Sequence, residues 1–280
     1  MLPQLRRTRT HRHCEVSSMY RFPCAWFTLT RDCVVVVFLA LHTDCHDIYM
    51  SSQQTATSGL YLIHIGTQRP LVVFCEMSKG GGWTVFQKIT LNSTLDFNRT
   101  WSEYKQGFGL VNGDHWLGNE HLHMLTHKGG RYRLKVELFR DNGTELWAEY
   151  DPFRVDGEAS KYKLRLGLHS GTAADALSQD SEAYLHDNQK FTTIDSDNDN
   201  YFQNCAELVY NGVSGGGWWY DACAGAILNR PNLIYWHEDC NRNNSCHSAR
   251  MLLQPSEPIK HCFVSHSEKC HMYSFPLEYP

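Results

Sequence analysis

The sequence predicts an α+β protein with a central antiparallel sheet, short helices and an irregular C-terminal part. Three observations support this prediction. Several segments alternate strictly between apolar and polar residues, the helix signals are few and short, and residues 186–247 are rich in Asn, Asp and Gly with little periodicity. An irregular segment of this length needs cross-links, because a sheet alone does not hold it.

The strongest strand signal lies in residues 131–140, where apolar and charged side chains alternate as in a strand with one solvated face. The inward positions are Tyr132, Leu134, Val136 and Leu138. Residues 141–143, Asp-Asn-Gly, favour a tight turn into residues 145–155, since Asn and Gly tolerate positive φ. Residues 161–168 repeat the alternation, so three consecutive antiparallel strands are expected.

Two short helices are predicted from their end signals. Thr100 and Glu103 have the spacing of a capping box, which indicates a helix that ends near Gly107. Asn119 is the expected N-cap of a second helix over residues 121–128, which two glycines then end.

The chain is expected to have three parts: a leader or signal-like segment (1–42), one domain (43–255) and an irregular tail (256–280). Residues 33–41 have the length of the apolar core of a signal peptide, and a start at Met19 would shorten the region before it. The alternative is a buried strand. No apolar run of 18 residues occurs, so no membrane span is expected.

Composition indicates an extracellular protein. The formal net charge of −4 gives no electrostatic reason to expect a nucleic-acid partner. Eleven cysteines without any C-x-x-C pattern favour disulfides in an oxidising compartment over a zinc site. The chain is therefore predicted to be secreted. Candidate N-glycosylation sites are Asn92, Asn98, Asn142 and Asn243.

Residues 195–201, Asp-Ser-Asp-Asn-Asp-Asn-Tyr, are the strongest local signal. Alternating carboxylates in an irregular loop offer the hard oxygen ligands that Ca²⁺ requires, although an acidic turn in solvent would read the same way. An EF-hand needs Gly at the sixth and Glu at the twelfth position, where this loop has Asn200 and Ala206. The loop is therefore not an EF-hand.

Uncommon motifs follow one another in a defined order between residues 44 and 255. They are Asp44-Cys45, Ser58-Gly59-Leu60-Tyr61, Val73-Phe74-Cys75-Glu76-Met77, Gly80-Gly81-Gly82-Trp83, Trp116-Leu117-Gly118-Asn119-Glu120, Asn204-Cys205-Ala206 and Gly217-Trp218-Trp219-Tyr220. In this order they resemble the fibrinogen C-terminal-type domain, the module of fibrinogen chains, ficolins, tachylectins, tenascins and angiopoietins.

The resemblance implies particular cross-links and ligands. It implies disulfides Cys45–Cys75 and Cys205–Cys223, the second of which stabilises by about 3 kcal/mol in the chain-entropy model. It also implies a calcium site formed by the side chains of Asp197 and Asp199 and the main-chain carbonyls of Tyr201 and Gln203. Asp195 is expected to support the loop, and the Asn204–Cys205 peptide is expected to be cis.

A ligand pocket is expected beside this loop, but the sequence departs from the lectin members of the family there. They carry His after the second loop cysteine, where this chain has Ala224, and a longer aromatic connection in place of residues 229–236. The candidate pocket residues are Asn204, Cys205, Tyr210, Trp219, Tyr220, Cys223 and Ala224, with Trp218 as a further aromatic candidate. Each aromatic side chain has core packing as its alternative.

The remaining cysteines leave several pairings open. Cys240 and Cys246 are candidates for an additional disulfide that compensates for the shortened connection, or else they are free thiols. The same alternatives hold for Cys262 and Cys270 in the tail. Seven cysteines remain after the two implied bridges, and an odd number leaves an intermolecular bridge, and hence an oligomer, open.

The resemblance implies a recognition module rather than an enzyme. The first hypothesis is lectin-like pattern recognition of glycans or acetylated groups, as in innate immunity. The alternative is an extracellular protein-binding module in the matrix, in growth-factor-like signalling or in coagulation. No nucleophile elbow, phosphate-binding loop or metalloprotease motif occurs in the sequence.

Overall fold

The computed structural model describes residues 25–30, 33–38, 41–66, 69–78, 80–127, 130–179, 185–210, 212–223 and 225–256. The chain divides into two compact units, residues 1–42 and 43–280. In the first, strands β1 (Ala25–Thr30) and β2 (Cys33–Phe38) pair as an antiparallel hairpin. Residues 33–38 are thus in a strand, and a cleaved signal segment stays a prediction. The predicted tail lies almost entirely outside the described residues.

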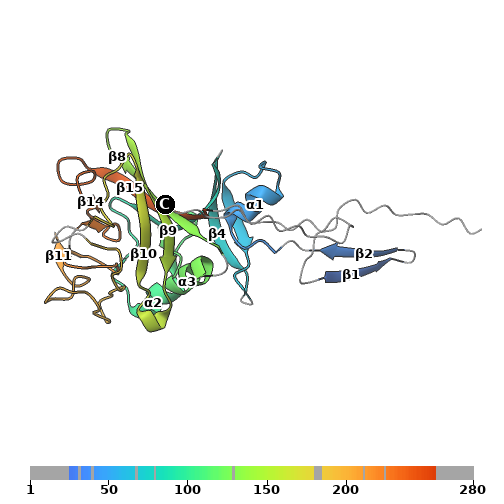
Figure 1. Ribbon diagram of the computed structural model, residues 1–280, viewed down its shortest axis with the longest axis horizontal. Coiled ribbons are helices and arrows are strands. Elements are labelled where there is room, and N and C mark those ends of the chain that lie inside the picture. Colours follow the sequence, from blue (N-terminus) through green and yellow to red (C-terminus); the bar gives the residue numbers. More distant parts are fainter. Residues whose placement is uncertain are drawn as a thin grey trace, which may run out of the picture. The chain divides into compact units, whose positions relative to one another are not determined.

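The second unit is built on a nine-stranded sheet, shown with its helices in Figure 1. Its main path runs β10 (Leu164–Gly171), β9 (Glu145–Val155), β8 (Tyr132–Arg140), β15 (Cys246–Pro255), β5 (Gly81–Thr90), β4 (Leu71–Ser78) and β3 (Gly59–Ile63). Two short strands, β6 (Phe108–Gly109) and β7 (His115–Trp116), join it through β5. All of these pairings are antiparallel, which confirms the predicted sheet.

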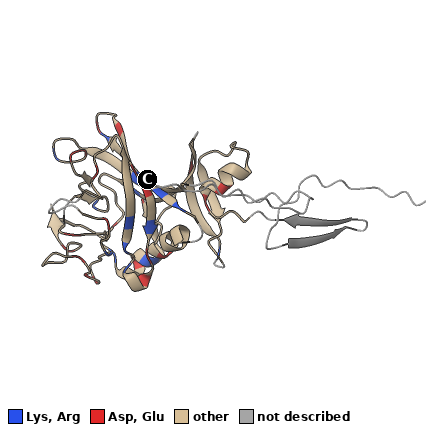
Figure 2. Cartoon of the chain, in the orientation of Figure 1, with Lys and Arg blue, Asp and Glu red and all other residues tan. Residues whose placement is uncertain are grey.

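The alternation in residues 131–140 explains how β8 sits in the sheet. Its four predicted inward side chains are buried, and β8 lies between β9 and the C-terminal strand β15. A central position is therefore taken by a strand from the end of the domain, which local sequence patterns do not reveal. Lys and Arg residues and Asp and Glu residues both occur along the strands and helices of this unit (Figure 2).

Within the described ranges, three α-helices and one 3₁₀ turn accompany the sheet. They are α1 (Cys45–Ser51), α2 (Trp101–Gln106), α3 (Asn119–His127) and the turn η1 (Glu158–Ser160). The capping box of Thr100 and Glu103 is present at the start of α2, as predicted. The predicted cap at Asn119 is wrong: this residue is inside α3, where its buried Oδ1 accepts a hydrogen bond from Trp116 Nε1 at 3.0 Å.

The C-terminal part has little regular structure, as predicted. It contains only two short antiparallel pairs among its described residues, β11 (Val209–Tyr210) with β12 (Val213–Ser214) and β13 (Ala226–Ile227) with β14 (Tyr235–Trp236). Large aromatic rings join this part to the rest of the domain. Buried Phe191 contacts Tyr104 of α2, Trp116 of β7 and Trp219, with ring centroids 5.1–5.6 Å apart.

A run of glycines makes this aromatic packing possible. A Cβ atom on Gly217 would lie 2.5 Å from Cε2 of Tyr104, so no larger residue fits there without displacing the ring.

No helix among the described residues is long and apolar enough to cross a membrane.

Candidate functional site

The acidic loop is anchored to the body of the domain by its first carboxylate. Asp195 Oδ1 accepts hydrogen bonds from the Trp101 backbone N–H at 2.7 Å and from Thr193 Oγ1 at 2.8 Å. Since Trp101 begins α2, a carboxylate here also interacts favourably with the positive end of the helix. Asp195 therefore supports the loop, in the role that the resemblance implies.

The two Asn residues of the loop hold it in place. Asn198 Nδ2 donates to the carbonyls of Phe191 and Ser196 at 2.9 and 3.0 Å. Asn200 Nδ2 donates to Asp221 Oδ1 at 2.8 Å, and its backbone N–H donates to the Asp221 carbonyl at 3.1 Å. The amide side chains of the alternating sequence therefore hold the loop to the protein, and the acidic side chains beside them are the candidate calcium ligands.

Asp197 and Asp199 form a pair of neighbouring carboxylates. Asp199 accepts from the backbone N–H groups of Tyr201 at 3.0 Å and Cys205 at 2.9 Å, and Asp197 Oδ1 accepts from the Asp199 N–H at 3.3 Å. Burial raises the pKa of Asp199, and the nearby Asp197 raises it further. Two adjacent carboxylates that disfavour each other's charge are suited to share a cation.

The donor set fits calcium. The predicted ligands are all hard oxygens, and within the described part of the chain the carbonyls of Tyr201 and Gln203 accept no hydrogen bond. The described residues contain no cluster of three or more His, Cys, Asp or Glu side chains able to hold a metal. The predicted site needs none, because two of its four protein ligands are main-chain carbonyls.

Both implied disulfides are present. Cys45 is bonded to Cys75, and Cys205 is bonded to Cys223, which closes the loop after the acidic segment. The expected cis peptide at Asn204–Cys205 is wrong, since the cis peptide of the described residues is Asp151–Pro152. A trans bond is the ordinary state of a non-proline peptide, because its cis form costs about 3 kcal/mol.

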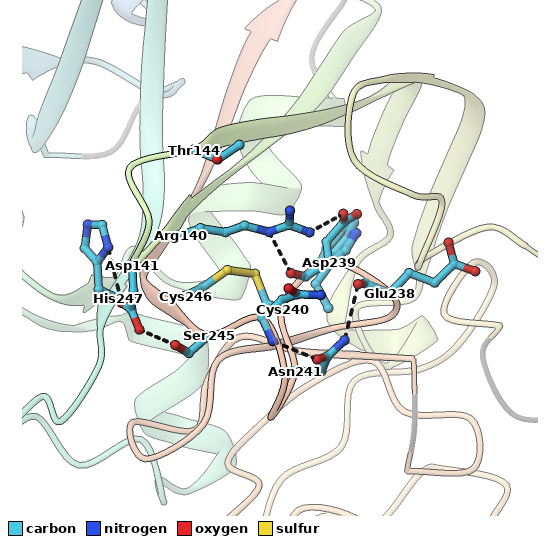
Figure 3. Close-up of a disulfide and its surroundings, with 12 residues drawn as sticks. Arg140, Asp141, Thr144, Glu238, Asp239, Cys240, Asn241, Ser245, Cys246 and His247 are labelled. Carbon is cyan, nitrogen blue, oxygen red and sulfur yellow. Dashed lines mark hydrogen bonds and ion pairs between the residues drawn. A yellow bond between two sulfur atoms is a disulfide. The ribbon is translucent and has the colours of Figure 1, made fainter.

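Cys240 and Cys246 form the additional disulfide (Figure 3). Both cysteines are buried, and Cys246 begins β15, so the bridge closes a small loop directly on the central sheet. Figure 3 also shows Arg140 pointing at Asp239, which it binds through Nε to the carbonyl at 3.0 Å and through its terminal nitrogen to Oδ1 at 2.9 Å. The other oxygen of Asp239 accepts from the Ala174 N–H at 2.6 Å.

Most aromatic candidates for the pocket are core residues. Trp218, Trp219 and Tyr220 have no exposed surface. The Trp219 indole donates to the Tyr162 carbonyl at 2.8 Å, and the Tyr220 hydroxyl donates to the Gly216 carbonyl at 2.9 Å. The assignment of Trp219 and Tyr220 to a ligand-binding wall is therefore wrong, because their polar atoms are already satisfied inside the domain.

The other candidates differ in position. Tyr210 is half-buried in β11, and Cys223 has a positive φ of 63°. Asn204 holds the loop closed, because its Nδ2 donates to the Thr193 carbonyl at 3.0 Å and its Oδ1 accepts from the Ala206 N–H at 2.9 Å. Ala224 lies outside the described residues. All four predicted glycosylation sites are exposed Asn side chains, and their modification stays a prediction.

A pocket of about 340 Å³ opens beside Tyr210. Its lining residues are Tyr210, Leu233, Tyr235, Asn241, Arg242 and Asn243. Of these, sequence reasoning identified only Tyr210 as a pocket residue. The signals for the others were the short 229–236 connection and the cysteine-closed loop after it, which the structure brings together beside β11.

The connection itself is tied to the central sheet. Gln87 of β5 donates through Nε2 to the Leu228 carbonyl at 2.8 Å and to Asn229 Oδ1 at 3.1 Å. Asn229 Nδ2 donates in turn to the Gly217 carbonyl at 2.8 Å. Buried hydrogen bonds therefore fix the chain segment that leads into the pocket-lining residues Leu233 and Tyr235.

Comparison with known proteins places the chain among relatives of fibrinogen. The sequence profile of the "Fibrinogen beta and gamma chains, C-terminal globular domain" matches residues 41–256. Fibrinogen-like protein 1-like protein of Gallus gallus is 41% identical over 211 residues, which cover 74% of this chain and 71% of that protein. Fibrinogen-like protein A of Apostichopus parvimensis is 43% identical over 220 residues, which cover 75% and 74%.

Further similar proteins include a longer relative and two solved structures. Angiopoietin-4 of Bos taurus is 38% identical over 77% of this chain, which spans only 43% of that protein. The fibrinogen-like globe domain of human ANGPTL6 superposes with a TM-score of 0.68 at 34% identity, over 79% of this chain and 98% of that one. Lamprey fibrin D-dimer, complexed with the peptide Gly-His-Arg-Pro-amide, has a TM-score of 0.67 at 28% identity, over 82% and 79%. The chain therefore belongs to the fibrinogen C-terminal globular domain family.

Proposed function

We propose that this chain is a secreted, calcium-binding recognition module that binds a segment of an extracellular protein in the pocket beside Tyr210. Members of the family are extracellular binding modules and not enzymes. The proposal concerns what this member binds and which of its residues take part.

The observation that carries the proposal is the character of the pocket. Its volume of about 340 Å³ accommodates one or two amino-acid side chains, and its lining combines two tyrosine rings and a leucine side chain with two asparagines and an arginine. The aromatic side chains that would have formed a sugar-binding wall at residues 218–220 are buried in the core. An open site of this size and composition suits a protruding peptide segment.

Calcium would be bound in the chain segment that leads to this pocket. Asp197 and Asp199 would supply carboxylate ligands, and Tyr201 and Gln203 would supply carbonyls. Asp199 also bonds the N–H of Cys205, and five residues later Tyr210 lines the pocket. Calcium would neutralise the adjacent carboxylates and so stabilise the segment that leads to the pocket.

The relatives support a protein ligand. The fibrin D-dimer of lamprey was solved with a four-residue peptide ligand, and the curated proteins similar to this chain include fibrinogen-like proteins and angiopoietins. Lectin activity was the first hypothesis from the sequence. The aromatic residues at 218–220 that were expected to bind a sugar are buried, so we treat glycan binding as the competing result of the experiment below.

The test is a parallel screen of the purified full-length chain on an array of extracellular proteins and on a glycan array, each with calcium and with EDTA. We expect retention on one or a few proteins, lost in EDTA and in the Asp197→Asn/Asp199→Asn variant. The Glu145→Gln variant is the matched control, since Glu145 is an exposed carboxylate at the start of β9. Calcium-dependent retention on simple glycans, with no protein bound, would overturn the proposal in favour of a lectin.

A further inference from the structure

We propose that the pocket beside Tyr210 selects an acidic side chain of its protein ligand, with Arg242 as the countercharge. This inference rests on the proposed function and adds the chemistry of the ligand. It follows from the position of two arginines, from their lack of acidic partners and from the walls of the pocket.

Two guanidinium groups contact the ring of Tyr210. Cζ of Arg242 lies 5.0 Å from the ring centroid and Cζ of Arg230 lies 5.8 Å from it, both within cation–π range. Arg242 Nε also donates a hydrogen bond to the Tyr210 hydroxyl. Arg242 lines the pocket, whereas Arg230 is 7% exposed and is not one of its lining residues.

Neither arginine forms an ion pair with a carboxylate of the described residues. Seven other arginines do so: Arg99, Arg131, Arg133, Arg140, Arg154, Arg165 and Arg250. Arg230 donates instead to the carbonyls of Leu208 at 3.2 Å and Ser214 at 3.4 Å, and burial lowers its pKa.

The uncompensated charge therefore lies at one side of the pocket. Binding of an apolar group beside an arginine displaces water, which lowers the effective dielectric constant around the charge and strengthens its attraction for an anion. An arginine that is exposed in the free protein can thus gain a charged partner on binding.

The apolar lining residues define what carries the anion. Leu233, Tyr235 and the Tyr210 ring present apolar surface, so the ligand must bring apolar atoms together with its charge. A Glu or Asp beside an aliphatic or aromatic residue of a peptide meets both requirements. Inorganic phosphate or a free sugar acid would leave the apolar walls in contact with water.

The pocket is preorganised on both sides. Arg242 is carried by the loop that the buried Cys240–Cys246 bridge closes, and Asn232 Nδ2 donates to the Tyr210 carbonyl at 2.8 Å. A binding group that is already held in place loses less conformational entropy when the ligand arrives.

The test is selection of a random peptide library against the full-length chain in calcium, followed by affinity measurements on the selected peptides. We expect the peptides to share an Asp or Glu next to an apolar residue. Replacement of that acid by its amide, or the Arg242→Gln variant, should each weaken binding about tenfold, whereas Arg242→Lys should retain most of the affinity. Combining both changes should add little, because they remove the same interaction.

The control variant is Arg154→Gln, since Arg154 is an exposed arginine of β9 and its partner Asp156 keeps a second arginine, Arg165. Selected peptides that bind equally well with their acid amidated, or equally well to Arg242→Gln, would overturn the acidic specificity alone. Failure to select any peptide would overturn the proposed function as well. Retention of a sulfated or sialylated glycan that Arg242→Gln loses would replace the peptide with an acidic glycan.

Discussion

The backbone N–H of Cys205 donates a hydrogen bond to Asp199 Oδ2 at 2.9 Å. One residue is thus both an end of the Cys205–Cys223 disulfide and a partner of a predicted calcium ligand. The cross-link and the acidic loop therefore form one unit, in which a change at either element is transmitted to the other through a single peptide group.

Calcium is expected to stabilise the folded domain. An ion that binds only the native state at a hundred times its dissociation constant adds about 2.7 kcal/mol to the free energy of unfolding. EDTA should lower the melting temperature of the wild type and leave that of Asp197→Asn/Asp199→Asn nearly unchanged. Calorimetry in both buffers checks this, with Glu145→Gln as control. An equal effect of EDTA on both proteins would exclude these carboxylates as ligands.

In the calcium-free protein, repulsion between the carboxylates of Asp197 and Asp199 should lower the free energy of unfolding. The pKa of Asp199 is raised in the folded state, so its contribution to stability is present at low pH and is lost as pH rises through that pKa. In EDTA at pH 7, Asp197→Asn should be more stable than the wild type, because it removes the adjacent negative charge.

The difference should shrink as the pH falls and Asp199 becomes protonated, and it should change sign in calcium, where Asp197 is a ligand. Urea denaturation at pH 4 and pH 7 measures both trends. A wild type that is the more stable protein in EDTA at pH 7 would contradict the expected repulsion.

Removal of the Cys205–Cys223 bridge should weaken calcium binding. The Cys205→Ser/Cys223→Ser variant is expected to lose about 3 kcal/mol of stability by chain entropy, while the sheet survives. The matched control is Cys240→Ser/Cys246→Ser, which should keep the calcium affinity and lose ligand affinity, because that bridge carries the pocket loop. Calcium titration and far-ultraviolet circular dichroism of both variants separate the two effects. Equal calcium affinity in the first variant and the wild type would refute the coupling.

Binding of N-acetylglucosamine is expected to be weak. The residues predicted as aromatic walls at 218–220 are buried, and the connection 229–236 is short, so a small sugar finds few fixed partners. Titration calorimetry should detect no calcium-dependent dissociation constant at or below about 1 mM, which corresponds to about −4.1 kcal/mol. A tighter constant would mean that Tyr210 and Tyr235 rebuild a sugar site.

The sequence was a good guide wherever a local pattern determines the structure. Alternation places the buried side of β8, and the capping box of Thr100 and Glu103 starts α2 as predicted. The acidic loop and its disulfide were expected from motifs of the chain, although the loop is held in part by distant residues such as Trp101. For the strand and the helix cap, neighbours within a few residues determine the conformation.

Tertiary packing determines the features that the sequence did not reveal. Whether Trp219 is a wall or a core residue depends on the Tyr162 carbonyl, which lies 57 positions away in the chain. Asn119 accepts a hydrogen bond from the Trp116 indole instead of capping its helix, because the buried indole N–H needs a hydrogen-bond acceptor. The pocket at Arg242 combines three segments, and no periodicity in any of them indicates which side chains meet.

The loop between Cys240 and Cys246 has an evolutionary consequence. The two cysteines are six positions apart, so only five residues lie between them, and the last of these, Ser245, is hydrogen-bonded to Asp141 in the turn between β8 and β9. Substitutions at positions 241–244 can therefore accumulate with little effect on the scaffold, much as hypervariable loops diversify on a constant framework. Exchange of this short cassette between homologues is a direct way to transfer ligand preference without redesigning the domain.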